Sequence, residues 1–171
     1  MTKNIYLWTG EGSGKTTSAL GVALRCAGHN MKVIIVQFMK GRKYIGEYKI
    51  MQKLKPYYQI YQFGKKEFIK PLNKPTKKDK ELAKKGLEFA KKAAEQKPRL
   101  LILDEINLAC AIGLIKTKDV VELVKHCSKH TIVYLTGRRA PAELKKIADF
   151  VNEIKLIKAP KKYPTRKGIE Y

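Results

Sequence analysis

Nine residues near the start of the chain carry the glycines, hydroxyl groups and lysine of a phosphate-binding loop. They are Thr9-Gly10-Glu11-Gly12-Ser13-Gly14-Lys15-Thr16-Thr17. Glycines let backbone N–H groups turn inward toward phosphate oxygens, and the N-terminus of a following helix favours anions. Lys15 would place a point charge on the phosphates, and the hydroxyl of Thr16 would suit Mg²⁺, which prefers oxygen ligands. The loop therefore predicts that the protein binds a polyphosphate.

The spacing of this loop departs from the common P-loop pattern in one place. The pattern GxxxxGK[ST] requires a glycine at position 9, which is Thr9, and the glycine follows one residue later at Gly10. We therefore expect a tighter loop that holds its polyphosphate differently. The alternative, a glycine-rich turn that merely begins a helix, is disfavoured because a strand, the loop, GKT and a helix follow one another in the order a P-loop needs.

Two acidic residues follow a short hydrophobic run in the second half of the chain. The segment at residues 100–103 is Leu-Leu-Ile-Leu, and Asp104 and Glu105 come directly after it. This order resembles a Walker B element, in which a carboxylate holds magnesium directly or through water. Together with the loop, it predicts Thr16, Asp104 and Glu105 as metal-binding residues. Two alternatives stay open: Glu105 as the base of an ATPase, and acids that stabilise the start of a helix.

A glycine turn with two arginines forms a third candidate, at residues 136–139. Arg138 in this turn is suited to clamp a triphosphate, because guanidinium groups bind phosphate oxygens in pairs. From physics alone, surface arginines beside a turn are an equally good explanation. The three histidines share no metal-ligand spacing, so they are not assigned to a metal site.

These candidates must be positioned by strands that end at one edge of a sheet. The patterns predict strands over 5–8, 33–38, 57–63, 100–103, 131–136 and 151–157, and helices over 15–27, 46–54, 80–96, 117–127 and 141–148. Gly28 is expected just beyond the first helix, Thr117 as an N-cap, Pro141 as a first helical residue, and 64–80 as an exposed loop. Alternating strands and helices predict an α/β, P-loop NTPase-like fold with a mostly parallel central sheet and helices on both faces. The length of the chain fits one P-loop nucleotide-binding domain over residues 1–171. In such a fold, ligands bind at the carboxyl ends of the strands.

The composition allows a different class of function, because the chain is strongly basic. Its 37 Lys and Arg against 15 Asp and Glu give a net charge of +22. A non-enzymatic binder of nucleic acid or polyphosphate would have such a charge. However, only six of these residues are Arg, the side chain that reads bases. We therefore interpret most of the charge as solvated surface and do not expect nucleic acid as a partner.

Cysteine spacing and the apolar pattern bound the remaining possibilities. Cys26, Cys110 and Cys127 are widely spaced and form no CxxC, which argues against a structural zinc site and a disulfide framework and favours core positions. The N-terminus lacks a signal-peptide layout, and no apolar run approaches the roughly 20 residues of a spanning helix. We therefore expect a cytoplasmic protein without a membrane partner.

The ordered set of motifs resembles the ATP:corrinoid adenosyltransferase family, the P-loop type of cob(I)alamin and cob(I)yrinic acid a,c-diamide adenosyltransferases. The loop is similar to the family's shortened TGxGxGKTT. Further similar segments are Ala27-Gly28-His29, Val36-Gln37-Phe38-Met39-Lys40-Gly41, Leu103-Asp104-Glu105-Ile106-Asn107, Thr136-Gly137-Arg138, Ala148-Asp149 and Lys167-Gly168-Ile169-Glu170-Tyr171. The resemblance thus covers nearly the whole chain.

This resemblance implies transfer of the 5′-deoxyadenosyl group of ATP to cobalt(I) of a reduced corrinoid, in adenosylcobalamin synthesis or salvage. Cobalt(I) attacks C5′ and triphosphate leaves, so no side-chain nucleophile is needed. Lys15 and Arg138 would stabilise the leaving triphosphate, residues 9–17 would bind ATP in the sense opposite to most P-loop enzymes, and Mg²⁺ would bind beside it. A corrinoid reductase or flavoprotein is the implied partner, and a homodimer is compatible with the family.

Two features of the family are altered in this sequence. Many members have an N-terminal segment that covers the active site, whereas eight residues precede the loop here, so we expect the aromatic and basic middle region to cover it. In that region Phe68 is similar to the first of two aromatic residues that contact the corrinoid, but no tryptophan accompanies it, since Trp8 is the only one. The alternative function is another P-loop ATPase or a nucleoside kinase with Glu105 as base.

Overall fold

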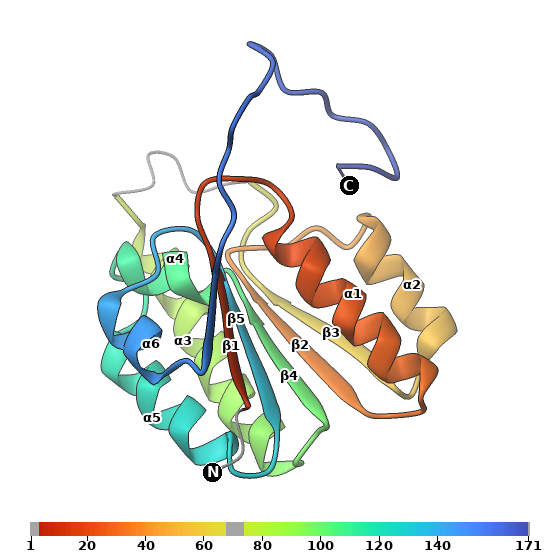
Figure 1. Ribbon diagram of the computed structural model, residues 1–171, viewed down its shortest axis with the longest axis vertical. Helices are drawn as coiled ribbons and strands as arrows, with labels where there is room; N and C mark the ends of the chain where they lie inside the picture. The colour runs from red at the N-terminus through yellow and green to blue at the C-terminus, as the bar shows by residue number, and fades with distance from the viewer. Residues whose placement is uncertain (1–3, 68–73, 171) are drawn as a thin grey trace.

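The computed structural model describes residues 4–67 and 74–170, and within them it confirms the predicted α/β architecture (Figure 1). The strands are β1 (Ile5–Thr9), β2 (Val33–Phe38), β3 (Tyr58–Phe63), β4 (Leu100–Asp104), β5 (Ile132–Thr136) and β6 (Phe150–Glu153). The helices are α1 (Lys15–Gly28), α2 (Gly46–Leu54), α3 (Lys77–Glu95), α4 (Ile106–Ala111), α5 (Thr117–Cys127) and α6 (Ala142–Ile147). All neighbouring strands pair in parallel, in the order β3-β2-β4-β5-β1-β6.

Helices cover both faces of this sheet because alternate residues of its strands point to opposite sides. In β4, Leu101 and Leu103 pack into a core with α3, α4, α5 and α6, while Leu100 and Ile102 pack into a second core with α1 and α2. Side chains of successive strand residues alternate between the two faces. Strands buried on both faces need continuous hydrophobic runs, which explains why β2 and β4 are buried along their whole length.

Helix α3 begins earlier than its apolar spacing predicts. The expected loop over 64–80 gives way to helix at Lys77, because Thr76 and Asp79 form a capping box. The Thr76 hydroxyl accepts a hydrogen bond from the Asp79 backbone N–H, and the Asp79 carboxylate accepts one from the Thr76 backbone N–H at 2.9 Å. These contacts satisfy two backbone donors that a helix N-terminus otherwise leaves free, so the lysine-rich first turn is stable despite its few apolar residues.

Several other helix boundaries differ from the prediction. The short helix α4 was not predicted, since six residues give too little periodicity to recognise. Gly28 is the last residue of α1 rather than a residue beyond it, and the left-handed residue after the helix is Asn30, with φ 57°. Lys116 and Pro141 are the N-caps of α5 and α6, so Thr117 is not a cap and Pro141 is not a first helical residue. Strand β6 ends at Glu153, four residues before its predicted end.

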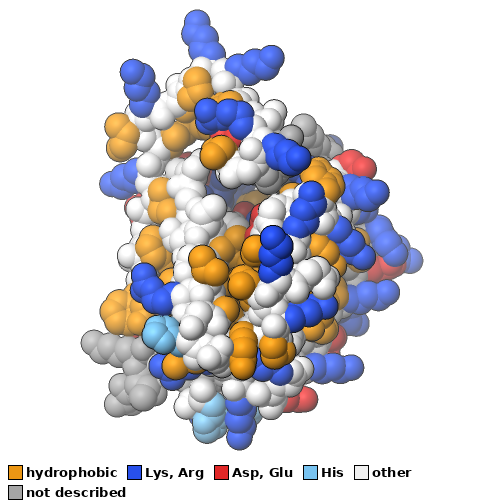
Figure 2. Space-filling model, turned by 90° about the vertical axis from the view of Figure 1, so that its right-hand side faces the viewer, with side chains coloured by type: hydrophobic (Ala, Val, Ile, Leu, Met, Phe, Trp, Pro, Cys, Tyr) orange, Lys and Arg blue, Asp and Glu red, His pale blue; other side chains and the backbone are white. Residues whose placement is uncertain are grey.

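The surface agrees with the interpretation of the charge. Figure 2 shows Lys and Arg side chains projecting from several separate parts of one face rather than from a single patch. The three cysteines are free, with Cys110 and Cys127 buried as expected and Cys26 half-buried. In the ranges that the structure describes, no helix has both the length and the apolar character needed to cross a bilayer.

Candidate functional site

The predicted site residues meet at the carboxyl ends of the central strands. Strand β4 ends at Asp104, which lies opposite Gln37 of β2 in the register, and β5 ends beside it at Thr136. The phosphate-binding loop connects β1 to α1 at the same edge of the sheet. The parallel arrangement therefore places Thr16, Asp104 and Glu105 together.

Asp104 is the buried centre of this site. Its Oδ1 atom accepts hydrogen bonds from the hydroxyls of Thr16 at 2.8 Å and Thr136 at 2.6 Å. Its Oδ2 atom accepts from Gln37 Nε2 at 2.9 Å and from Lys40 Nζ at 2.8 Å. Burial alone would raise the pKa of Asp104, but Lys40 and the hydroxyl donors outweigh burial and lower the pKa below its usual value. Asp104 is therefore an ionised, fully hydrogen-bonded carboxylate.

Lys40 is the site residue that the sequence did not single out for a chemical role. Its ammonium lies 2.8 Å from Asp104 Oδ2 and 3.3 Å from Thr16 Oγ1. Burial would lower the pKa of Lys40, but attraction to Asp104 and Glu105 outweighs it and raises the pKa, so the side chain is a cation at neutral pH. The sequence placed Lys40 two residues after a buried strand, inside the family-like segment at residues 36–41, but did not indicate its direction.

The loop that carries Lys40 has an unusual backbone. Met39 adopts the left-handed region with φ 57°, which costs energy in a residue other than glycine. Gly41 and Gly64 meet backbone to backbone, so a Cβ added to Gly41 would lie 2.4 Å from the Gly64 carbonyl oxygen. The Met39 N–H also donates to the Phe63 carbonyl at 3.0 Å. These contacts turn the chain after β2 so that Lys40 points back toward Asp104.

Glu105 differs from its neighbour because its carboxylate lacks compensating contacts. Its backbone has φ 61°, and its N–H donates to the Thr136 hydroxyl at 3.1 Å. Its Oε2 atom is buried and has no hydrogen-bond partner among the described residues. Burial and the adjacent Asp104 charge raise the pKa of Glu105. A buried, unsatisfied carboxylate oxygen costs free energy, and a cation or a donor from a ligand would remove that cost.

Lys15 reaches back across the phosphate-binding loop. Its ammonium donates to the Gly12 carbonyl, and the side chain is almost fully buried. Burial first, and then repulsion by Arg138, lower the pKa of Lys15. Gly14 precedes α1 with φ 108° and has no side chain to cap the helix. A phosphate at this point would gain a positive side chain beside a helix N-terminus.

The far side of the loop is held by the chain that follows β6. The Gly12 N–H donates to the Ile154 carbonyl at 2.8 Å, and the Ile154 N–H donates to the Thr9 carbonyl at 2.9 Å. Gly10, with φ 96°, is so close that an added Cβ would lie 2.4 Å from the Ile154 oxygen. The Thr9 hydroxyl accepts from the Ala140 N–H at 3.2 Å. Thr9, Gly10 and Gly12 are thus tied to neighbouring segments.

The remaining predicted residues lie around this centre. Arg138 pairs with Glu11 of the loop at 3.3 Å, and both side chains are more than half exposed. Asn107, to which the sequence gave no role beyond its place in a family-like segment, donates from Nδ2 to the carbonyls of Trp8 at 3.1 Å and Gly137 at 3.2 Å, and so joins the ends of β1 and β5. Phe68, the predicted corrinoid contact, lies outside the described residues.

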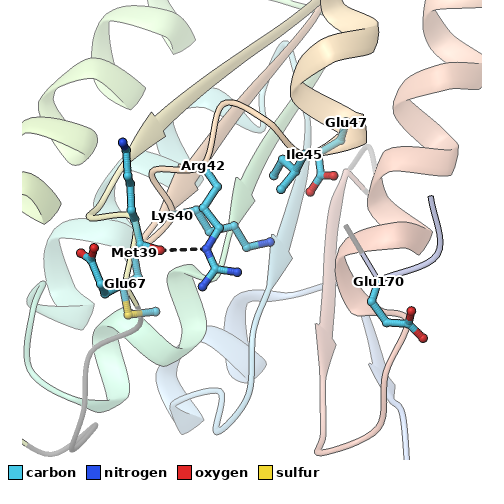
Figure 3. Close-up of a pocket in the computed structure, with 8 residues that line it drawn as sticks. Met39, Lys40, Arg42, Ile45, Glu47, Glu67 and Glu170 are labelled. Atoms are coloured by element: carbon cyan, nitrogen blue, oxygen red, sulfur yellow. Dashed lines mark hydrogen bonds between the residues drawn. The ribbon is translucent and has the colours of Figure 1, made fainter. Parts of the chain in front are cut away.

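Two cavities open beside the site. One of about 150 Å³ adjoins the loop after β2 (Figure 3), and its lining consists of Met39, Lys40, Arg42, Ile45, Glu47, Lys66, Glu67 and Glu170. A larger one of about 600 Å³ lies between α1 and α2 and includes apolar side chains of both helices, together with Thr16, Thr17 and Lys40. Lys40, Glu47 and Glu170 line both cavities, so the two cavities adjoin at these residues.

Comparison with known proteins identifies the relatives of this chain. A family model described as ATP:corrinoid adenosyltransferase BtuR/CobO/CobP matches residues 2–171. A corrinoid adenosyltransferase of Sinorhizobium sp is 35% identical over 169 residues, which cover 97% of this chain and 76% of the relative. One from Pseudomonas aeruginosa is 30% identical over 170 residues, covering 98% and 83%. One from Escherichia coli is 29% identical over 155 residues, covering 90% and 77%.

Proposed function

The chain belongs to the ATP:corrinoid adenosyltransferase family, and on this premise we propose how its site transfers the adenosyl group. It is a transferase whose substrates are ATP and a corrinoid. The proposed reaction is attack of cobalt(I) of a reduced corrinoid on C5′ of ATP, with triphosphate as the leaving group. The observation that carries the proposal is the contact between Thr16 and Asp104 beside Lys15.

The phosphate-binding loop is proposed to hold the triphosphate of ATP through residues 9–17. Lys15 lies within the loop and would exchange its bond to the Gly12 carbonyl for phosphate oxygens. Arg138 stands at the rim, on Glu11, and would approach the phosphates from the other side. Triphosphate gains negative charge as it leaves, and positive groups already in place stabilise that charge without reorganising.

Magnesium is proposed to bind beside Thr16, Asp104 and Glu105. Among the described residues, no three His, Cys, Asp or Glu side chains are clustered so as to hold a metal alone. The oxygens fit an ion that takes its other ligands from phosphate and water: Thr16 and Asp104 are in contact, and the buried Oε2 of Glu105 lacks a partner within the described part of the chain. A bound divalent cation would neutralise phosphate charge.

The protein itself is proposed to orient the reactants and exclude water, because cobalt supplies the nucleophile. The site residues Gln37, Thr136 and Asp104 are fully buried, so the floor of the site is rigid. We place the corrinoid over the carboxyl ends of β2 and β3, where the cavity of Figure 3 opens and the segment with Phe68 begins.

Partners and location are also proposals. Cobalt(I) must be generated by a reductant, so a corrinoid reductase or flavoprotein is the expected partner, and the family is compatible with a homodimer. ATP as substrate supports a cytoplasmic location. One continuous sheet contains both β1, which leads into the loop, and β4, which ends at Asp104, and this supports a single nucleotide-binding domain over residues 1–171.

The test is an anaerobic spectral assay with cob(I)alamin and Mg-ATP. The wild-type protein should form adenosylcobalamin, and Lys15→Ala should lower kcat/KM by about 100-fold or more. Lys118→Ala is the matched control, since this lysine of α5 is highly exposed and pairs only loosely with Glu122. Formation of ADP with no cobalt–carbon product would instead favour an ATPase or nucleoside kinase that uses Glu105 as base.

A further inference from the structure

The ammonium of Lys40 contacts oxygens of both Thr16 and Asp104, two residues at which a divalent cation is proposed to bind. It is 3.3 Å from Thr16 Oγ1 and 2.8 Å from Asp104 Oδ2. An ion bonded to these oxygens at about 2.1 Å would enter the space that the ammonium fills, and like charges at such a distance repel strongly. We propose that Lys40 is a tethered counter-ion that competes with the divalent cation for the Thr16–Asp104 pair and is displaced when the cation binds.

Lys40 is the donor best suited to leave Asp104. Gln37 and Thr136 are fully buried within strands, and each makes a further hydrogen bond, Gln37 with Gln62 and Thr136 with the Glu105 N–H. The Lys40 side chain is 20% exposed, whereas that of Asp104 is fully buried. Among the four side-chain donors to Asp104 in the described part of the chain, Lys40 alone carries a charge. If a divalent cation takes the place of the Lys40 ammonium, the buried carboxylate of Asp104 still has a positive charge beside it. The cation would thus replace the charge that Lys40 supplies, which none of the neutral donors supplies.

The structure also offers the displaced ammonium a destination. Lys40 and Glu47 both line the cavity in Figure 3, and Lys40 extends along its wall. Glu47 lies at the start of α2 and already attracts the Lys40 charge. A flexible four-carbon stem lets a lysine ammonium move several ångströms by rotation about its side-chain bonds. Lys40 would therefore turn from Asp104 toward Glu47 without a change of the backbone.

The backbone around Lys40 holds the start of its side chain in place. Met39 keeps a left-handed φ of 57°, and Gly41 and Gly64 are in backbone contact. Such strain persists only where the surroundings impose it, and it is concentrated at functional sites. The rigid loop and the mobile ammonium together would couple the cation site to the cavity of Figure 3, where the corrinoid is proposed to bind. The competition rests on the proposed cation site, and this coupling rests also on the proposed corrinoid site.

The competition can be tested by titrating the full chain with Mn²⁺ in the absence of nucleotide. The electron paramagnetic resonance signal of the free ion measures how much Mn²⁺ is bound. Lys40→Gln keeps a hydrogen-bond donor but removes the charge, and should bind Mn²⁺ about 10-fold or more tightly than wild type. Lys40→Arg should bind Mn²⁺ as weakly as wild type. Lys49→Gln is the matched control: this α2 lysine is exposed, and its replacement changes the net charge equally.

Adding Thr16→Val to Lys40→Gln should abolish the tight binding and so locate the ion. Equal Mn²⁺ affinity of wild type and Lys40→Gln, or tight binding that survives Thr16→Val, would overturn the proposal. If Lys40→Gln does not fold, acylation of wild-type Lys40, read by peptide mass, should become several-fold faster with saturating Mn²⁺, and no change would reject displacement. None of these readouts depends on adenosyl transfer, so failure of the proposed function would be seen separately.

Discussion

The hydroxyl of Thr16 lies 2.8 Å from Oδ1 of Asp104, a contact between residues 88 positions apart in the chain. It joins the first turn of α1 to the end of β4, and with it the phosphate-binding loop to the acidic pair. Because Asp104 also receives Gln37, Lys40 and Thr136, one carboxylate fixes the relative positions of four segments. The consequences of this arrangement can be measured both in stability and in activity.

Thr136→Val should destabilise the protein, and Thr131→Val should not. The Thr136 hydroxyl donates to Asp104 at 2.6 Å and accepts from the Glu105 N–H at 3.1 Å. Its loss leaves the Glu105 N–H without a partner and leaves Asp104 Oδ1 with Thr16 as its remaining donor, at a cost of about 1–3 kcal/mol. The Thr131 hydroxyl is buried without a partner among the described residues, which makes it a matched control. Chemical denaturation measures both variants. An equal free energy of unfolding for the two variants would show that the hydrogen bonds of the Thr136 hydroxyl do not stabilise the fold.

Gly10→Ala should disturb the phosphate-binding loop. The backbone of Gly10 has φ 96°, and an added Cβ would meet the Ile154 carbonyl oxygen at 2.4 Å. The loop must then separate from the chain after β6, which lowers both the free energy of unfolding and ATP affinity. Gly21→Ala in α1 meets nothing within 4 Å and should stabilise the helix by about 0.5–1 kcal/mol. Calorimetry of ATP binding and thermal unfolding should be measured for both variants. An unchanged ATP affinity of Gly10→Ala would contradict the expectation.

Glu105→Gln should make the protein without ligands more stable at pH 7. Burial and the Asp104 charge raise the pKa of Glu105 in the folded state above the usual glutamate value of 4.5, so the ionised carboxylate opposes folding whenever the pH exceeds both pKa values. As the pH falls through the folded-state pKa toward 4.5, the wild type gains its proton and the advantage of the variant should vanish. Denaturation curves across this range measure it. An advantage that grows on acidification would have the wrong sign.

Arg138→Ala should slow adenosyl transfer with little effect on folding. Its ion pair with Glu11 joins two side chains that are more than half exposed, and such pairs contribute about 0–1 kcal/mol. A guanidinium on the leaving triphosphate contributes more, so kcat/KM should fall about 10-fold or more. The neighbouring Arg139 is also exposed, and Arg139→Ala is the control. Equal loss of activity in both variants would assign the effect to general surface charge.

The sequence was sufficient to bring the main site residues together. Thr16 is placed by the order of strand, loop, GKT and helix. Asp104 directly follows a short continuous apolar run of the kind that forms a buried strand. Since the carboxyl ends of parallel strands share one edge, their meeting follows once the sheet is predicted to be parallel. This reasoning does not depend on the exact limits of any helix.

Lys40 and Ile154 were beyond the reach of the same reasoning. The direction of Lys40 depends on the left-handed backbone of Met39 and on the contact between Gly41 and Gly64, which lie 23 positions apart by their residue numbers. Ile154 contacts the loop through its backbone alone, so its side-chain type gives no signal. Contacts that rest on the backbone conformation of two distant segments leave no periodic pattern in the sequence.

In the proposed reaction, ATP transfers its adenosyl group to the corrinoid as one unit and releases its three phosphates together. The most direct measurement is phosphorus-31 NMR of the products after anaerobic reaction of the protein with cob(I)alamin and Mg-ATP. We predict inorganic triphosphate in a one-to-one ratio with the adenosylcobalamin formed. Appearance of ADP and orthophosphate in its place, with no cobalt–carbon bond formed, would contradict the account.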